Sequence, residues 1–478
     1  MQTYQDYLSA ADRGAFIKQA IDEHTAGELY KTAVSADLYD RQRNETIYNY
    51  VRMIRDSTHN PIVDITAANN RIASNFFHRL NTQRCSYLLG NGVNFKDKAT
   101  RDKLGVKFDQ DLNDWAYKAL IHGVCFGFWN HERLCVFPVT EFVPLWDEDT
   151  GALEAGIRFW SNGEKKPGVA MLFTSEGITR YVKPPEDTST YIRDGDEDEP
   201  YITNFEYTEA GGTMVVGTDN YGHLPIVPMW GSRLRQSTLV GMREKIDSYD
   251  LIQSGFANDL TDCAQIYWLI ENCGGMTNED LQEFLNNIRM NHVAKVDTSS
   301  FDGSTHSALS PYVQDVPYQG RRVYLDGMRA SIYEDFGALD VHMIHASSTN
   351  DHIDAAYQPL DEEADQFELQ VVEAVQRLLS LLGIDDTPIF KRNRISNVKE
   401  QIEAVMLEAK YLDDIAVRQL LPNITVDMQE AIQARLVDAE AGRMTLMKSY
   451  TSGDEKTLRG PSEAAEEPPA DVLSEVAP

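Results

Sequence analysis

The sequence has few cysteines, and their spacing does not match a metal site or a redox motif. Its 478 residues include five, and none of them forms a CxxC pair. A disulfide framework needs an even set of cysteines in a secreted chain, and a zinc site needs closely spaced ligands. We therefore expect reduced thiols in the core of a protein made in a cytosol. The five are Cys85, Cys125, Cys135, Cys263 and Cys273.

Long hydrophobic runs are also missing. No stretch of about 18 apolar residues occurs, so no membrane-spanning helix is expected. The first residues, 1–6, have neither the basic start nor the apolar run of a secretion signal. With 42% hydrophobic and 25% charged residues, the composition is that of a globular protein. The length is sufficient for more than one domain.

Positive charge is scarce. The chain has 44 basic residues against 75 acidic ones, and its net charge is −31. A protein that holds nucleic acid tightly by its phosphates needs a basic face. The balance argues against tight, sequence-specific DNA binding. It fits ordinary solubility best, and it would suit a channel wall only if DNA must pass close to it without sticking.

Known catalytic motifs are absent. The sequence contains no GxxxxGK[ST], HExxH or GxSxG, and no GxGxxG that follows a strand and opens a helix. One cluster could bind a transition metal: His342, His345 and His352, with Asp351 and Asp354. Metal ligands need fixed surroundings. The polar composition of this segment instead favours a loop whose neutral side chains make weak hydrogen bonds to phosphates. We predict no catalytic residue, metal or cofactor.

One early segment has a clear helical pattern. Residues 68–89 read as a helix of about 20 residues, with Asn69 or Asn70 as the N-cap. Gly90 could take the left-handed conformation that ends a helix. The apolar positions at near-helical spacing are Ile72, Phe76, Leu80, Tyr87 and Leu88.

A β region follows a second helix at 111–121. The pattern of 123–137 predicts a hairpin that turns at 130–132. The two prolines in 223–230 argue against a helix and fit an edge strand or an extended segment. The acidic insert at 194–200 reads as a solvated loop tip. The other predicted strands, which complete an antiparallel region of about 100 residues, are 156–160, 169–174, 178–182, 201–207 and 213–217.

Long helices dominate the rest of the chain. A helix over 237–263 would reach about 40 Å. A β-α-β insert follows, with strands at 265–271 and 292–296, a helix from Asn278 and a loop-rich stretch at 299–320. A returning helix at about 321–339 precedes the polar loop. The remaining predictions are a helix over 355–382 that could start at Pro359, helices at 398–411 and 426–447, and a disordered acidic tail at 451–478.

Several motifs resemble a known family. The run N-R-I-x-x-N-F-F-x-R-L-x-x-x-x-x-S-Y-L-L-G-N at 70–91 resembles the early helix of the siphophage-type portal protein family of tailed bacteriophages, with Gly92 where proline is usual. Segment 360–368 resembles the start of the family's tunnel helix, and 390–400 its late segment, with Ile395 in place of proline. A stem pattern is matched at Asp247, Tyr249, Ser254, Asn258 and Asp259.

The order of elements resembles the portal architecture as well. The resemblance implies an α+β, mainly helical portal fold with wing, stem, clip and crown regions and an antiparallel β region in the wing. The implied regions are the wing 1–236, first stem helix 237–263, clip 264–319, second stem helix 320–340, tunnel loop 341–354, tunnel helix and wing return 355–395, crown 396–450 and acidic tail 451–478.

The resemblance also implies a function. A dodecameric ring would sit at one capsid vertex, in the virion, after assembly in the host cytoplasm. It would be the channel for double-stranded DNA during packaging and ejection. The implied partners are the terminase large subunit, head-completion or adaptor proteins, and the major capsid and scaffolding proteins. The alternatives are another head or tail ring protein, such as an adaptor, and a metal-dependent nuclease.

Two groups of residues carry this implied function. The tunnel loop would contact DNA through His342, Ile344, His345, Ser347, Ser348, Thr349 and Asn350. The clip would bind terminase and adaptor proteins through Glu279, Asp280, Glu283, Asn287, Arg289 and Asp302. The family's usual small-Ser-Gly residues before the tunnel helix are replaced here by Asp354-Ala355-Ala356, so the end of the loop stays open.

Overall fold

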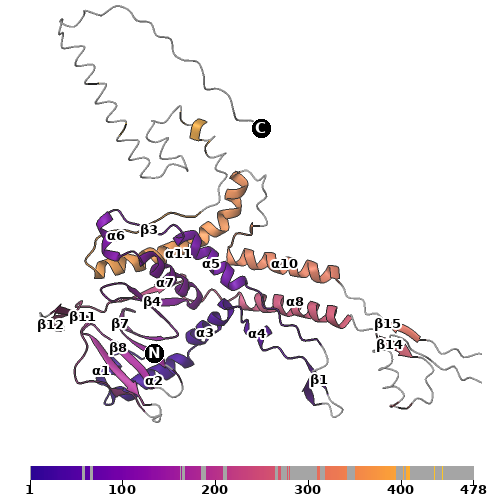
Figure 1. Ribbon diagram of the computed structural model, residues 1–478, viewed down its shortest axis with the longest axis horizontal. Helices are drawn as coiled ribbons and strands as arrows, with labels where there is room; N and C mark the ends of the chain where they lie inside the picture. The colour runs from indigo at the N-terminus through magenta and orange to yellow at the C-terminus, as the bar shows by residue number, and fades with distance from the viewer. Residues whose placement is uncertain are drawn as a thin grey trace, which may run out of the picture. The chain divides into compact units, whose positions relative to one another are not determined.

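The computed structural model describes most of the chain up to residue 393. The described residues are 2–55, 60–64, 68–161, 163, 167–184, 190–207, 213–263, 267–270, 277, 279, 309–312, 318–341 and 350–393, together with 402, 405–407, 409, 435 and 444. Met1–Ile395 form one compact unit and Ser396–Pro478 a second. The predicted helices at 398–411 and 426–447 and the predicted tail at 451–478 lie largely or wholly outside the described residues. The following concerns the first unit (Figure 1).

Short helices open the chain. Thr3 caps the first of them in a capping box with Asp6, which satisfies two backbone N–H groups at the helix start. The fourth leads into a two-stranded ribbon, in which Met53 pairs with Val63. These elements are α1 (Tyr4–Ser9), α2 (Arg13–Ala26), α3 (Glu28–Asp40), α4 (Glu45–Tyr48), β1 (Met53–Arg55) and β2 (Pro61–Val63).

Two antiparallel sheets form the predicted β region. One has five strands in the order β10-β9-β8-β7-β6, and the other has three in the order β13-β4-β5. The strands are β4 (Val124–Trp129), β5 (Leu134–Pro138), β6 (Phe142–Trp146), β7 (Leu153–Ser161), β8 (Gly168–Phe173), β9 (Ile178–Lys183), β10 (Ile192–Arg193) and β13 (Ile226–Trp230). The hairpin around 130–132 and the edge position of β13 are confirmed; β6 and β10 were not predicted.

Aromatic residues fill the space between these sheets. Phe126 and Phe142 have ring centroids 4.4 Å apart, and Phe128 and Phe173 are 5.4 Å apart. The outer face of the five-stranded sheet is covered by α1 and α2, where Ile17 is completely buried. The predicted strands at 201–207 and 213–217 pair with each other as β11 (Ile202–Tyr207) and β12 (Thr213–Asp219).

A helical layer packs on the three-stranded sheet. Trp115 of α7 (Phe108–His122) is fully buried, and its ring N–H donates to the carbonyl of Cys125, 3.0 Å away. The core around it also includes α5 (Phe76–Leu89) and Phe367 and Leu378 of α11 (Asn350–Leu381). The smaller elements here are α6 (Lys98–Leu104), β3 (Val93–Asn94) and β16 (Ile389–Phe390), with β3 paired to β16.

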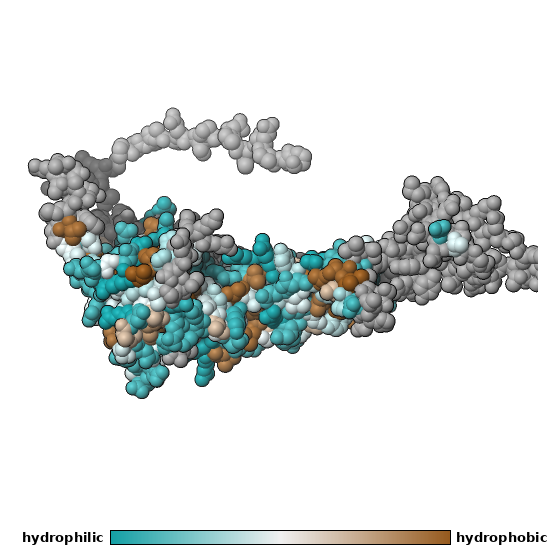
Figure 2. Space-filling model, turned by 90° about the horizontal axis from the view of Figure 1, so that it is seen from below, coloured by the Kyte–Doolittle hydropathy of each residue, from teal (hydrophilic) through white to brown (hydrophobic). Residues whose placement is uncertain are grey.

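Two long helices, α8 (Arg243–Cys263) and α10 (Tyr318–Phe336), run antiparallel side by side (Figure 1). At one end of the pair Phe256 contacts Tyr318, with ring centroids 5.6 Å apart. At the other end Ile246 and Ile332 are buried together with α3 and α5. Figure 2 shows hydrophobic residues at the surface of the pair, near the end that α3 and α5 do not cover.

The boundaries of these helices correct the prediction. Helix α8 begins at Arg243 instead of 237, because residues 238–242 form turns in which Gly241 has φ +83°. Helix α11 begins at Asn350 instead of 355 or Pro359, so Pro359 lies inside the helix. Buried Ile353, Tyr357 and Leu360 explain this, since tertiary packing outweighs the cost of an internal proline.

The predicted insert between the two helices is described only in part. Tyr267–Ile270 form β14, as expected, but its partner is β15 (Leu309–Tyr312), which the sequence had placed in a loop-rich stretch. The predicted strand at 292–296 and most of the helix from Asn278 lie outside the described residues. Among the helices that the structure describes, none is both long and apolar enough to cross a membrane.

Candidate functional site

The predicted contact residues fall mostly outside the described part of the chain. Of the tunnel-loop set, Asn350 is described, as the first residue of α11. Of the clip set, Glu279 is described, as an exposed helical residue. His352 and Asp354 lie on α11, so the predicted end of the loop at 354 is wrong. The others, His342, Ile344, His345, Ser347, Ser348, Thr349, Asp280, Glu283, Asn287, Arg289 and Asp302, lie outside the described residues.

What the structure does describe is how the two segments on either side of 342–349 are held. One segment leaves the end of α10, and the other is the start of α11. Both rest on α5, through Gln83, Arg84 and Tyr87. These contacts are named the loop anchor below.

Gln83 holds the segment after α10. Its side-chain amide donates to the carbonyl of Leu339 over 3.0 Å, and its amide oxygen accepts from the N–H of Leu339 over 3.2 Å. Paired hydrogen bonds of this kind replace those that a β partner would provide, so Leu339 is fixed although it lies outside any regular element. Two residues later the described segment ends at Val341.

Arg84 joins both segments. Its guanidinium donates to the carbonyl of Phe336, the last residue of α10, over 2.6 Å, and lies 3.2 Å from a carboxylate oxygen of Glu363 on α11. The guanidinium also sits over the ring of Phe336, 4.4 Å from its centroid. Burial lowers the pKa of Arg84, while the negative charge of Glu363 opposes that shift. A buried cation with these partners ties α5, α10 and α11 together.

Tyr87 holds the start of α11. Its hydroxyl donates to Asp361 over 2.5 Å, and its ring stacks on Tyr357 with centroids 5.7 Å apart. Asp361 also accepts from Arg392, 2.9 Å away, whose guanidinium contacts Asp365 and Glu368 as well. Burial alone would lower the pKa of Arg392, but these three carboxylates together outweigh it and raise the pKa. The C-terminal return of the chain is therefore fastened to α11.

The segment before α5 is extended and is held by one face of α8. The N–H groups of Asn70, Ile72 and Ser74 donate to side chains of Asn258, Ser254 and Asp250, over 2.5, 2.9 and 2.9 Å. Alternate residues of an extended chain lie about 6.6 Å apart, and residues four apart on a helix lie about 6 Å apart. The two repeats match, which allows three successive bonds. These contacts are named the stem ladder below.

The stem ladder corrects the predicted helix at 68–89. The helix starts at Phe76, because the backbone N–H groups before it are already paired with α8. Ile72, expected on the apolar stripe, is 37% exposed. Gly90 has φ −62°, and the left-handed residue is Gly92, with φ +73°. The ladder also gives Ser254 and Asn258, two residues of the predicted stem motif, a structural role.

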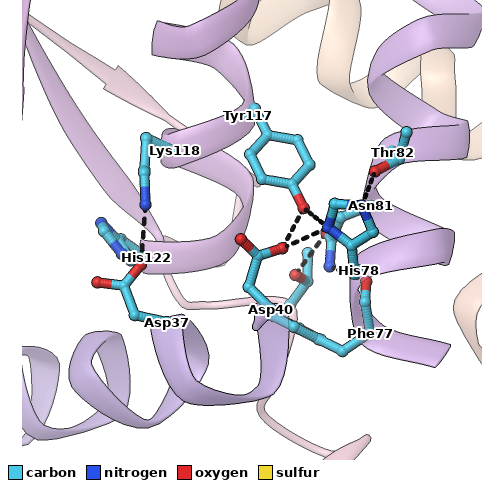
Figure 3. Close-up of polar contacts among 10 residues, drawn as sticks. Asp37, Asp40, Phe77, His78, Asn81, Thr82, Tyr117, Lys118 and His122 are labelled. Carbon is cyan, nitrogen blue, oxygen red and sulfur yellow. Dashed lines mark hydrogen bonds and ion pairs between the residues drawn. The ribbon is translucent and has the colours of Figure 1, made fainter. Parts of the chain in front are cut away.

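A polar cluster fastens α3 to α5 and α7 near the base of α8 (Figure 3). Asp37 of α3 accepts from Lys118 over 2.8 Å and lies 3.0 Å from Nε2 of His122. Burial alone would raise the pKa of Asp37, but these two donors outweigh it and lower the pKa. Burial lowers the pKa of His122, whose side chain is completely enclosed.

The second half of the cluster is built on Asp40. It accepts from the hydroxyl of Tyr117 and lies 2.9 Å from Nδ1 of His78. Burial and then the Asp40 carboxylate raise the pKa of Tyr117. The Asp37 set joins α3 to α7, and the Asp40 set joins α3 to α5 and α7, so these polar groups are used in contacts between helices. Within the described residues, no group of three or more His, Cys, Asp or Glu side chains could hold a metal ion.

The chain is similar to known proteins over most of its length. The family model described as "Phage portal protein, SPP1 Gp6-like" matches residues 33–443. The chain belongs to this phage portal family. The match covers the sheets, both long helices, the loop anchor and α11, while α1, α2 and the start of α3 precede it.

Two curated relatives agree with this assignment. The portal protein of Clostridium phage phiCD119 is 23% identical over 416 residues, which is 79% of this chain and 88% of the relative. The portal protein of Bacillus phage SPP1 is 24% identical over 432 residues, 82% of this chain and 79% of the relative. A solved structure described as the neck of an empty GTA particle, computed with C6 symmetry, is 9% identical and covers 73% of this chain and 90% of that one, with a TM-score of 0.39.

Membership of the portal family confirms the resemblance found in the sequence and makes this chain a phage structural protein. The structure adds Gln83 and Arg84, which sequence reasoning missed. A signal was available: Arg84 stands four residues after Leu80 and four before Leu88, so a basic residue falls within the apolar stripe. A charge in that position predicts a buried ion pair.

Proposed function

We propose that this portal protein forms a ring, with twelve copies, at one vertex of the phage head, and that double-stranded DNA passes through the ring during packaging and ejection. The family match and one structural observation support this proposal. The antiparallel pair α8–α10 is anchored at its base to the same helix, α5, that holds both sides of 342–349. Movement of the pair would therefore be transmitted to the residues around the channel.

The proposal assigns the two predicted contact regions. Residues 342–350 contact the DNA, and 264–319 form the clip that binds the terminase large subunit and later the head-completion proteins. Coat and scaffolding proteins contact the ring during assembly in the host cytoplasm. The net charge of −31 supports passage without binding, since an acidic wall repels phosphates.

We further propose a structural role without catalysis. The described His and Asp clusters support this, because their polar atoms are used to join helices. For the nuclease alternative, metal analysis of purified wild-type protein and of His345→Ala is the direct test. Stoichiometric metal that the substitution removes would favour the nuclease.

The ring is tested by negative-stain microscopy and mass photometry of the purified full chain. The expected result is a ring with a central hole and a mass near twelve times 54.0 kDa. A compact monomer at every concentration and salt condition would refute the proposal. A ring whose size and shape match a head-to-tail adaptor would favour that alternative instead.

A further inference from the structure

A groove on the described unit has a chemistry that is unusual for this chain. It has a volume of about 750 Å³ and lies beside β13, the turn between β6 and β7, and the C-terminal half of α11. Trp146 and Trp230 stack in its wall, with ring centroids 5.9 Å apart. Three arginines line it: Arg233, Arg235 and Arg377.

Two of these arginines have no carboxylate partner among the described residues. Arg377 pairs with Glu373 over 2.6 Å. Arg235 lies over Trp230, 4.6 Å from the ring centroid, and its backbone has φ +55°, in the left-handed region that few residues other than glycine adopt. Arg233 is exposed, beside Leu234, which is 76% exposed. On a chain of net charge −31, two unpaired arginines beside stacked tryptophans favour an acidic partner.

The five-stranded sheet, which has β6 at one edge, carries an acidic loop at its other edge. Residues 194–199 are exposed, and the loop is tied to β9 at both ends. Asp194 donates its N–H to the carbonyl of Arg180, and Ile178 and Glu199 exchange two backbone hydrogen bonds. Asp196 and Glu197, at the tip, make no hydrogen bond or ion pair with any described residue. The tip is therefore held in place but has no partner within this chain's described part.

The register of the strands fixes how groove and loop relate. Trp146 pairs with Leu153 and Gly156 with Phe173, and Phe173 pairs with Ile178. The groove beside Trp146 and the loop beside Ile178 therefore lie at the same end of the sheet. They lie at opposite edges, because β6 and β10 are the two outer strands. Four strand spacings separate these edges, roughly 19 Å.

A ring needs two different, complementary surfaces on each copy, one on either flank. We infer that the acidic loop 194–199 of one copy enters the groove lined by Arg233 and Arg235 of the next copy. This rests on the proposed ring. Strong net charge of one sign opposes association of like chains, so the attraction has to come from local pairs such as this one. Strand addition to β13 is disfavoured as an alternative, because Pro228 lies at the centre of that edge.

Charge exchange between two variants tests the inference. Arg233→Glu with Arg235→Glu gives a chain whose groove and loop are both acidic. Asp196→Lys with Glu197→Lys gives one in which the groove and the tip of the loop are both basic, while Asp194, Asp198 and Glu199 stay at the sides of the loop. Each alone should need at least about tenfold more protein to form rings, since like charges then face each other. An equimolar mixture should form rings again, because every contact then joins an acidic flank to a basic one. The chain with all four substitutions should also assemble.

The control is Arg41→Glu with Arg43→Glu, which changes the net charge by the same amount and in the same direction as the groove variant, at two exposed positions outside the groove. It should assemble like wild type, and circular dichroism should show all variants folded. Mass photometry measures the rings. Wild-type assembly of either double variant, or no recovery in the mixture, would overturn the inference. Rings of the groove variant that fail only to bind a different head protein would overturn it too. Failure of wild type itself to form rings would instead refute the proposed function.

Discussion

Arg84, in the middle of α5, donates a 2.6 Å hydrogen bond to the carbonyl of Phe336, the residue that ends α10. The helix that follows the β1–β2 ribbon thereby holds the end of a helix some 250 residues later in the chain, just before residues 342–349, which we propose to contact DNA. The side chain of Arg84 is only 7% exposed, so water has little access to replace the Phe336 carbonyl and Glu363 as partners of the guanidinium.

We expect Arg84→Ala to destabilise the protein by about 2–3 kcal/mol, because it leaves the Phe336 carbonyl unpaired and removes a buried cation from Glu363. Arg84→Lys should recover only part of this, since an ammonium cannot reproduce the planar fork. Denaturant unfolding followed by circular dichroism measures the change. Arg79→Ala, at an exposed position on the same helix, is the control. Equal midpoints for Arg84→Ala and the control would show that the loop anchor is not energetically important.

The free energy of unfolding should decrease as the pH is lowered from 7 to 5, and His122 should contribute to this decrease. Its Nε2–H faces Asp37, and its Nδ1 is buried with no partner among the described residues. Protonation would place a charge there, so the folded pKa lies below the unfolded value of about 6.5. A depressed pKa means that the unfolded state binds the proton first, so stability is lost as the pH falls below about 6.5.

The variant His122→Gln should therefore show a shallower pH dependence over this range. One titrating group contributes at most about 1.4 kcal/mol per pH unit. Some slope should remain, because burial also lowers the pKa of His24. Unfolding midpoints at pH 7, 6 and 5 are the measurement. An unchanged slope in the variant would mean that His122 binds protons equally in the folded and unfolded states, so that folding does not lower its pKa.

The thiols of Cys85 and Cys125 should be inert in the native protein. Both are buried, and burial raises the pKa of Cys85 to about 12 and that of Cys125 as well, so almost no thiolate forms at pH 8. We expect peptide mass spectrometry after brief alkylation to find both unmodified, and modified fully in guanidinium chloride. The half-buried Cys135 is an internal comparison. Labelling of Cys125 as fast as Cys135 would show that the sheet core opens readily.

Much of the fold was predictable because local pattern and tertiary packing agree. In α7 the apolar spacing places Leu112, Trp115 and Ala119 on one buried face, so its position came out nearly right. The family itself was predictable from ordered motifs, which the family match confirms. The tunnel-loop and clip contacts stay predictions.

Two of the failures share one physical cause. Where a segment's backbone is satisfied by a distant element, local preference is a poor guide. Residues 70–74 were predicted to be helical, but their backbone N–H groups bind side chains of α8 that lie about 180 residues away in the sequence. Pro359 should have started a helix, yet packing of Tyr357 and Leu360 against Tyr87 and Leu339 carries α11 through it. Neither partner can be identified from the nearby sequence.

The stem ladder makes its own prediction, which depends on the direction of each hydrogen bond. Asp250 is an acceptor on both sides: one oxygen takes the N–H of Ser74, and the other takes the side-chain amide of Asn44. Asp250→Asn is nearly the same size, but it turns one acceptor into a donor that faces another donor. We expect it to destabilise the segment more than Ser254→Ala, which removes the bond from the N–H of Ile72 and a longer one to the carbonyl of Ile72, together worth about 1 kcal/mol.

Hydrogen exchange of the peptide that covers 68–75 measures this directly. The exchange rate should rise about fivefold in Ser254→Ala, in line with about 1 kcal/mol, and more than that in Asp250→Asn. Gln253→Ala, half-buried on α8 beside the ladder, should leave it unchanged. If Asp250→Asn exchanged no faster than Ser254→Ala, the charge and acceptor geometry at the base of the ladder would not matter. The extended segment would then be held by packing alone.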